Sequence, residues 1–114
     1  MASATSSAPD AAFAALADPT RRRVLELLRD REQMTAGELA AAFPEVSRPS
    51  VSKHLRILRH ARLVTVTQSG REWHYRLNTP PLATIHYTWM STFVPLFDES
   101  LQRLKIRVES RRTS

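Results

Sequence analysis

The sequence predicts a mainly α-helical fold with a small β-hairpin, and three observations lead to this fold class. A short helix and a basic helix are separated by only a few residues around Pro44. Two alternating segments, 64–68 and 71–77, follow at once and flank the two-residue turn signal Ser69-Gly70. A long apolar stripe then runs through residues 79–110. Two closely joined helices followed by a hairpin form a winged helix-turn-helix, and the terminal helices remain available for a dimer interface.

Length and charge limit the organisation and the partners. A chain of 114 residues, 42% of them apolar, can build one modest core but not two. We therefore expect residues 10–110 to form a single domain, and residues 1–9, which are mostly Ser, Ala and Thr, to be a disordered tail. The formal net charge of +6 favours a polyanionic partner, either nucleic acid or a membrane surface.

Several classes of protein are excluded by what the sequence lacks. It has no run of about 18 apolar residues, as a membrane span requires, and its N-terminus has no basic start or apolar core of a secretory signal. The sequence therefore predicts a cytoplasmic protein, associated with the nucleoid if the polyanion is DNA. Because it contains no cysteine, disulfides and thiolate metal sites are excluded.

Two helices are predicted before the helix-turn-helix. An alanine-rich segment from Asp10 places Phe13 and Leu16 three residues apart, which indicates a short helix. Asp18 then serves as N-cap, and Pro19 as the first residue, of an amphipathic helix. We interpret the run Arg21-Arg22-Arg23 as a solvated face, with contact to a nucleic-acid backbone as the alternative.

The first helix of the pair is predicted over residues 36–43. Thr35 and Glu38 form a capping-box pattern, and Leu39 and Phe43 supply an apolar side before Pro44 ends the helix. A link of three or four residues then leads into the second helix. An αα-corner of an unrelated helical protein would give the same pattern at this point.

The second helix begins after Ser47, a good N-cap residue, and Pro49 sits where a missing N–H is tolerated. At about 100° per residue, one side carries Val51, Leu55, Leu58 and Arg62, and the opposite side carries Pro49, Ser52, Lys53, Arg56 and His60. No carboxylate interrupts the outward side. Small hydroxyl residues permit close approach to a major groove, and long cations reach phosphates or guanine edges. An ordinary solvated basic face is the alternative.

The hairpin predicted after this helix has one apolar and one polar face. Pairing across the turn sets Val66 opposite Trp73 and Val64 opposite Tyr75, with Thr67 opposite Glu72 and Thr65 opposite His74 on the polar face. Residues 68–71 then form the tip of a wing, where Arg71 is the cation best placed to reach nucleic acid. A hairpin that only covers the helices is the alternative. The predicted DNA-binding residues are Arg48, Ser50, Ser52, Lys53, Arg56 and Arg71.

The C-terminal stripe is wider than a small winged-helix core requires, which suggests a self-complementary interface. Pro95 removes a helical hydrogen bond, so we expect a kink or break near residues 92–94. An intramolecular core is the alternative. The predicted dimer-interface residues are Phe13, Leu16, Ile85, Trp89, Phe93, Leu96, Phe97, Leu101 and Leu104.

Four segments together resemble the ArsR/SmtB-type winged-helix repressors of bacteria and archaea. They are Leu16-Ala-Asp-Pro-Thr-Arg-Arg-Arg-Val-Leu-Glu-Leu-Leu28, Glu38-Leu-Ala40, Ser50-Val-Ser-Lys-His-Leu-Arg-Ile-Leu58 and Gly70-Arg-Glu-Trp-His-Tyr-Arg-Leu77. The resemblance spans roughly residues 11–78. It implies a DNA-binding regulator that dimerises through its terminal helices, and it assigns His54 to the framework of the recognition helix.

The chain departs from the family pattern at two places. Arg62 stands where the family usually has glycine, so Arg62 or a neighbour needs an uncommon backbone conformation. The cysteine-containing metal motif is missing from residues 38–43. Aligning the family's C-terminal metal site on His86 places Thr84, Phe97 and Ser100 at the other ligand positions, and none of the three binds zinc well. We therefore predict no metal site and no cofactor.

The predicted function is that of a homodimeric transcriptional regulator, a repressor that binds a pseudo-palindromic DNA operator without metal sensing. One alternative is a repressor with an organic effector at the helix interface around Trp89 and Phe93. Another is a winged-helix module that binds protein or RNA. An enzyme is not expected, because no nucleophile, base and orienting group recur at a recognisable spacing.

Overall fold

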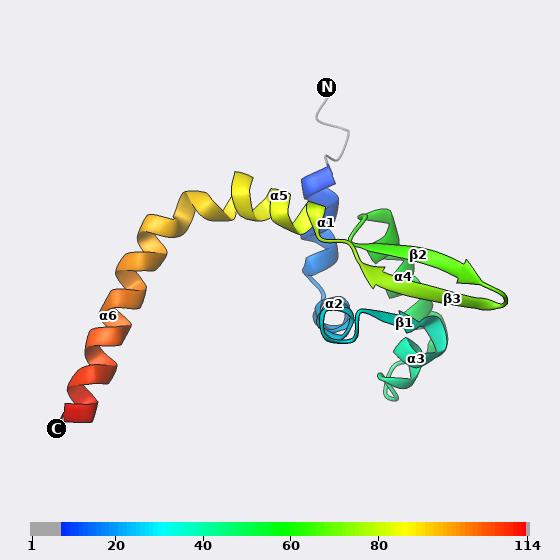
Figure 1. Cartoon of the computed structure of the whole chain (residues 1–114), viewed down its shortest axis with the longest axis horizontal. Coiled ribbons are helices and arrows are strands. Elements are labelled where there is room, and N and C mark those ends of the chain that lie inside the picture. Colours follow the sequence, from blue (N-terminus) through cyan, green and yellow to red (C-terminus); the bar gives the residue numbers. More distant parts are fainter. Residues whose placement is uncertain (1–7, 114) are drawn as a thin grey trace. The chain divides into compact units, whose positions relative to one another are not determined.

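The computed structural model describes the backbone of residues 8–113 and, within that range, all side chains except those of residues 8, 9, 97, 98, 106 and 108–113. The chain divides into two compact units whose boundary lies between Leu82 and Ala83. The elements of the first unit are α1 (Ala8–Leu16), α2 (Pro19–Arg31), β1 (Gln33–Thr35), α3 (Ala36–Ala41), α4 (Arg48–His60), β2 (Val64–Ser69) and β3 (Glu72–Leu77) (Figure 1). Helix α5 (Pro80–Thr88) crosses the boundary, and the 3-10 helix η2 (Met90–Phe93) and α6 (Val94–Thr113) follow. Mostly helical structure with a small antiparallel sheet confirms the predicted fold class.

The predicted helix starts are confirmed by their side-chain caps. Asp18 accepts a hydrogen bond from the N–H of Arg21 (3.0 Å), and Ser47 accepts one from the N–H of Ser50 (3.2 Å). Thr35 and Glu38 form the reciprocal capping box, in which each side chain accepts from the other residue's backbone N–H. These short-range contacts fix where α2, α3 and α4 begin.

Helix α3 is shorter than the predicted range 36–43. It ends at Ala41, because the N–H of Phe43 bonds to the carbonyl of Ala40 in a tighter turn (3.1 Å). The chain is therefore already leaving the helix before Pro44. The connection between α3 and α4 consequently runs from 42 to 47, longer than predicted.

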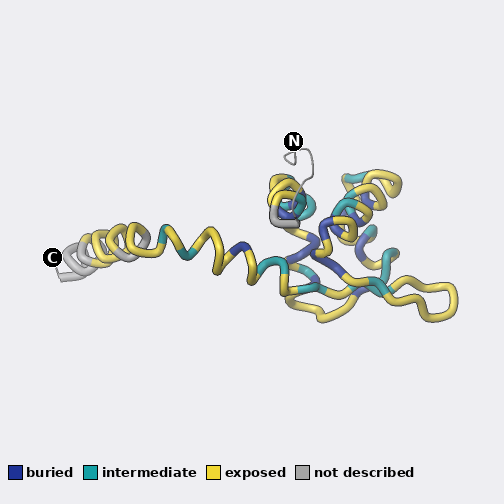
Figure 2. The backbone as a smooth tube through the Cα atoms, turned by 90° about the horizontal axis from the view of Figure 1, so that it is seen from above, coloured by how far each residue is buried: buried dark blue, intermediate teal, exposed yellow. Residues whose placement is uncertain are grey.

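The core of the first unit lies where α1, α2, α3 and α4 meet one another and the sheet, and its buried segments are dark blue in Figure 2. Val51, Leu55 and Leu58 of α4 are buried, as the helical periodicity predicts. The largest fully buried side chains are Leu28, Leu39, Leu58, Leu63 and Val24. Helix α4 is thus anchored by its apolar side, and its opposite side is left exposed.

The register of the hairpin was predicted wrongly by two residues. Val66 pairs with Tyr75 and Val64 with Leu77, while Trp73 pairs with Gln68. The turn is Gly70-Arg71 rather than Ser69-Gly70, because Ser69 still pairs with Glu72. Gly70 has φ 63°, which suits the first central position of a two-residue hairpin turn. A shift of two leaves every side chain on its predicted face.

A third strand was not predicted. Residues Gln33–Thr35 form β1, which pairs antiparallel with β3 and gives the sheet order β1-β3-β2. Met34 lies opposite Tyr75 and is buried. This strand ties the start of α3 to the hairpin, so the helix-turn-helix and the wing are parts of one packed unit.

In the second unit the predicted break is confirmed. Helix α5 ends at Thr88, the 3-10 helix η2 follows, and Pro95 lies in the first turn of α6, where its missing N–H is tolerated. Over the described range 8–113, no helix is both long and apolar enough to cross a membrane.

Candidate nucleic-acid interface

The outward side of α4 is exposed and cationic. Arg48, Ser50, Ser52, Lys53 and Arg56 are all exposed, and α4 contains no carboxylate. At the start of the helix the hydroxyl groups of Ser47 and Ser50 are hydrogen-bonded to each other, with Ser47 donating to Oγ of Ser50 (3.0 Å). Five of the six predicted DNA-binding residues are thus exposed residues of α4.

The sixth predicted residue, Arg71, lies elsewhere, at the exposed tip of the hairpin beside Gly70. The hairpin tip is closed by the Gln68 amide, which donates to the carbonyl of Gly70 (3.4 Å). Trp73, which points to the apolar face of the hairpin, lies under the guanidinium of Arg59, 5.8 Å from Cζ to the ring centroid. This cation–π contact joins the wing to α4.

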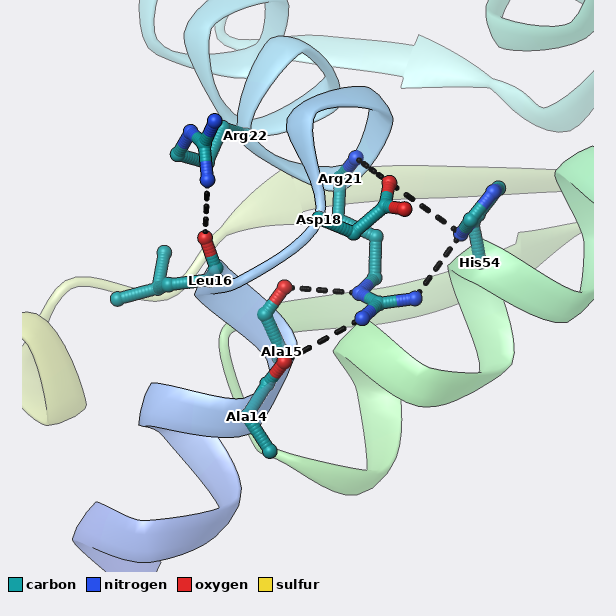
Figure 3. A network of polar contacts seen from close by, with 7 residues as sticks. All are labelled: Ala14, Ala15, Leu16, Asp18, Arg21, Arg22 and His54. Atoms are coloured by element: carbon teal, nitrogen blue, oxygen red, sulfur yellow. Dashed lines mark hydrogen bonds and ion pairs between the residues drawn. The ribbon is translucent and has the colours of Figure 1, made fainter.

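Arg21 fixes the position of α4 against α1 and α2 (Figure 3). Its Nε donates to the carbonyl of Ala15 (2.8 Å) and its Nη2 to the carbonyl of Ala14 (3.3 Å), which satisfies the C-terminal end of α1. Its Nη1 lies 3.1 Å from Nδ1 of His54 on α4. The interpretation of Arg21 as part of a solvated face is therefore wrong. Its side chain is hydrogen-bonded to α1 and to His54 and is not free in solvent.

The neighbouring charged groups belong to the same network. Arg22 donates to the carbonyl of Leu16 (2.7 Å), while Arg23 is exposed and pairs with Glu26. Oδ2 of Asp18 lies 3.8 Å from Nδ1 of His54. Burial raises the pKa of the Asp18 carboxyl, but the hydrogen bond from the N–H of Arg21 and the electrostatic interactions with His54 and Arg21 outweigh it, so this pKa lies below its ordinary value. His54 is half-buried, in agreement with a framework role in the recognition helix.

The turn after α4 confirms the uncommon backbone expected at Arg62. Arg62 has φ 61°, and the N–H groups of Arg62 and Leu63 bond to the carbonyls of Arg59 and Leu58 (both 3.0 Å). This pattern is a Schellman motif with arginine at the position that glycine usually occupies. The amide of Asn78 donates to the carbonyl of Arg62 (2.6 Å) and holds the turn in place.

A cationic hollow, defined by Arg56, Arg59, His60 and Arg62, lies at the C-terminal end of α4. Its volume is about 430 Å³. Helical periodicity placed Arg62 on the apolar side, which is wrong, because α4 ends at His60 and the left-handed turn redirects Arg62 to the surface. The sequence does not predict that these four residues gather. Its one indication is that Arg56 and His60 lie four residues apart, on the same side of α4.

The predicted dimer-interface residues differ in exposure. Leu96, Leu101 and Leu104 are 61%, 60% and 56% exposed, and Trp89 is about half exposed. Phe93 is half-buried and its ring meets that of Trp89 edge to face, with centroids 5.0 Å apart. In contrast, Ile85 is already buried in the single chain. Of the remaining predicted residues, Phe13 is exposed, Leu16 is half-buried, and the side chain of Phe97 lies outside the described residues.

No group of three or more potential metal-binding side chains occurs among the residues that were described. His86 meets the ring of Tyr87 edge to face, with centroids 5.0 Å apart. His74 lies on the polar face of the sheet, where its Nδ1 is 3.3 Å from the Gln33 amide and its Nε2 is 3.6 Å from Glu72.

Comparison with known proteins identifies relatives of this arrangement. Residues 16–67 match a helix-turn-helix domain family. The chain is 40% identical over 89 residues to the transcriptional repressor SdpR of Bacillus subtilis, covering 78% of this chain and 96% of that protein. It is 46% identical over 77 residues to the regulator Rv2034 of Mycobacterium tuberculosis, covering 68% and 70% of the two chains. It also resembles the solved structure of an ArsR-like transcriptional regulator from Rhodococcus sp. RHA1, with 35% identity, a TM-score of 0.66 and coverage of 88% and 89%.

Proposed function

Because the chain belongs to the ArsR/SmtB-type winged helix-turn-helix regulators, we propose that it is a homodimeric repressor that binds a pseudo-palindromic operator without sensing metals. Members of this family are DNA-binding regulators of transcription and not enzymes. A repressor of this kind acts by occupying a promoter, which places it on DNA in the nucleoid.

The single observation that carries the proposal is the exposed side of α4. It presents hydroxyl and cationic residues without a carboxylate on a helix whose opposite side is buried. Small residues near the helix start allow the backbone to approach base edges, and arginine can bind guanine with two hydrogen bonds. We assign Ser50, Ser52, Lys53 and Arg56 to the major groove, and Arg48 and Arg71 to phosphates or the minor groove.

The homodimer is supported by the apolar side chains of the second unit. Leu96, Leu101 and Leu104 of α6 are more than half exposed in the single chain, a large apolar surface for a small protein. A two-fold axis between two copies would present two α4 helices to successive major grooves, roughly 34 Å apart.

The side chains available as metal ligands support the lack of metal sensing. The chain has no cysteine, and Thr84, Phe97 and Ser100 occupy positions where the family's C-terminal site needs good zinc ligands. Elemental analysis of the purified protein tests this part of the proposal, and a stoichiometric transition metal would contradict it.

The decisive experiment titrates the purified protein against the DNA upstream of its own gene and against a scrambled duplex, at two salt concentrations. We expect tighter binding to the upstream duplex and a steep loss of affinity with salt. Equal binding to both duplexes, or no binding, would contradict the proposal and favour a protein- or RNA-binding module. Sedimentation of the same sample tests the dimer.

A further inference from the structure

We propose that the cationic hollow at the C-terminal end of α4 seats a backbone phosphate of the DNA duplex. Arg56, Arg59, His60 and Arg62 line it. This assignment rests on the proposed function and adds Arg59, His60 and Arg62 to the six residues predicted from the sequence. It adds a site that positions the protein on the duplex without reading bases.

The length of α4 places the hollow at the edge of the groove. A helix of 13 residues is about 20 Å long at 1.5 Å per residue. The major groove of B-DNA is only about 12 Å wide. When the first turns of α4 lie against base edges, the last turn therefore reaches the wall of the groove, and that wall is formed by sugars and phosphates.

The positive charge of the hollow favours binding of an anion. Three guanidinium groups and an imidazole gather there, and no ion pair found among the described side chains involves any of the four. Arginine forms paired, charge-assisted hydrogen bonds with phosphate oxygens, so a phosphate would relieve the mutual repulsion of the three arginines.

The fold restrains two of the three arginines. The side chain of Arg59 is stacked on Trp73 of the wing, and the backbone of Arg62 is held by the left-handed turn and by the Asn78 amide on its carbonyl. The stacking reduces the rotational freedom of the Arg59 side chain before an anion binds, which lowers the entropic cost of binding. The use of arginine at a backbone position that glycine fits better agrees with a role for its side chain.

Arg62→Gly is the sharpest test, because glycine accepts φ 61° more easily than arginine and the variant should fold at least as well as the original protein. We expect its melting temperature to be equal or higher. We expect the slope of log affinity against log salt to become less steep by about 0.9, the value for one phosphate contact in B-DNA. Affinity should fall by the same factor on the upstream and scrambled duplexes.

The matched control is Arg29→Gln, which removes one positive charge from an exposed residue of α2 that pairs with Asp30. Its salt slope should equal that of the unaltered protein. If the unaltered protein binds no duplex, the proposed function fails. If it binds and Arg62→Gly has the same slope as the control, only the phosphate assignment fails.

A free phosphate-bearing ligand is the other source of the same chemistry. Inorganic phosphate is added to the 15N-labelled protein, with chloride at equal ionic strength as reference, and the amide signals of Arg59, His60 and Arg62 are followed. Shifts at these amides, combined with an unchanged salt slope for Arg62→Gly, would assign the hollow to a free ligand and overturn the duplex assignment.

Discussion

Nη1 of Arg21 lies 3.1 Å from Nδ1 of His54, and this contact joins the start of α2 to the recognition helix. A guanidinium group can only donate hydrogen bonds, so Nδ1 of His54 is the acceptor in this contact. The same arginine caps the end of α1 through the carbonyls of Ala14 and Ala15. One side chain therefore links three helices and sets the orientation of α4.

Arg21→Ala should destabilise the first unit by roughly 2 kcal/mol, because it removes two partly buried hydrogen bonds and one exposed hydrogen bond from a charged donor. Urea unfolding measures the change. The control is Arg22→Ala, which removes one exposed hydrogen bond to Leu16 and should cost less than about 1 kcal/mol. An equal loss in the two variants would show that the contact with His54 does not stabilise the fold.

Asp18→Ala should cost about 1 kcal/mol of stability at neutral pH through the lost N-cap. The side chain of Asp18 is about one third exposed, so solvent screening keeps the charge contribution small. Its pKa is lowered in the folded state, so the charge contribution is fully present above the ordinary value of about 3.9 and is lost as pH falls through the folded value. The stability difference between original protein and variant should therefore shrink below about pH 4.

Asp18→Asn is the control for this pH dependence, because asparagine is an equally good N-cap residue without a titrating group. Its stability relative to Asp18→Ala should stay constant as the pH is lowered. Urea unfolding at a series of pH values checks both curves. A constant difference for Asp18 itself would contradict the lowered pKa.

The parts of the fold that the sequence predicts are those with short-range causes. The caps at Asp18, Thr35 and Ser47 depend on residues three positions apart, and the burial of one side of α4 depends on helical period alone. The hairpin register escapes prediction because a shift of two residues exchanges partners without changing faces. The three residues of β1 are too few to show an alternating pattern.

In the candidate site, too, only features with short-range causes could be predicted from the sequence. The outward residues of α4 follow from periodicity and lack of carboxylates. The contact of Arg21 does not, because its partner His54 is 33 residues away in the chain. The exposure of Arg62 does not either, because the left-handed turn takes it out of the helical period, and this turn is held by Asn78, 16 residues away. From the sequence alone, a charged side chain such as that of Arg21 is expected to be solvated, because its tertiary partner is not known.

Glu32→Gly should raise the stability of the protein by about 1 kcal/mol, through release of backbone strain. Glu32 follows α2 with φ 63° and ψ −53°, a conformation that is rare and strained for a residue with a side chain. Glycine adopts positive φ without this penalty, although it also adds freedom to the unfolded chain. Urea unfolding of Glu32→Gly and of the control Glu32→Ala separates strain from loss of charge. Equal stability of the two variants would contradict the strain.

Trp89→Ala should weaken the proposed dimer. Trp89 is about half exposed in the single chain and stacks edge to face on Phe93, so its removal takes away apolar surface and loosens its neighbour. Sedimentation over a range of low concentrations should show more monomer than for the original protein. Arg103→Ala, which removes only an exposed pair with Glu99, is the control and should leave the profile unchanged. An unaltered profile for Trp89→Ala would remove it from the interface.

Arg56→Ala should weaken binding to the specific duplex by about 1–3 kcal/mol if Arg56 reads a guanine. Arg56 lies on the outward side of α4 and also lines the cationic hollow, so it can contribute to base reading and to phosphate binding. Loss of a base contact reduces the preference for the specific over the scrambled duplex, whereas loss of a phosphate contact weakens both equally. Competition binding with the two duplexes measures this preference.

Arg48→Ala is the matched comparison, because Arg48 is an exposed arginine of the same helix that we assign to phosphate. It should weaken binding to both duplexes by the same factor and make the salt dependence less steep by about 0.9. A change in sequence preference for Arg48→Ala would reverse its assignment. Unchanged affinity and preference for Arg56→Ala would exclude Arg56 from the interface, and base reading would then depend on Ser50, Ser52 and Lys53.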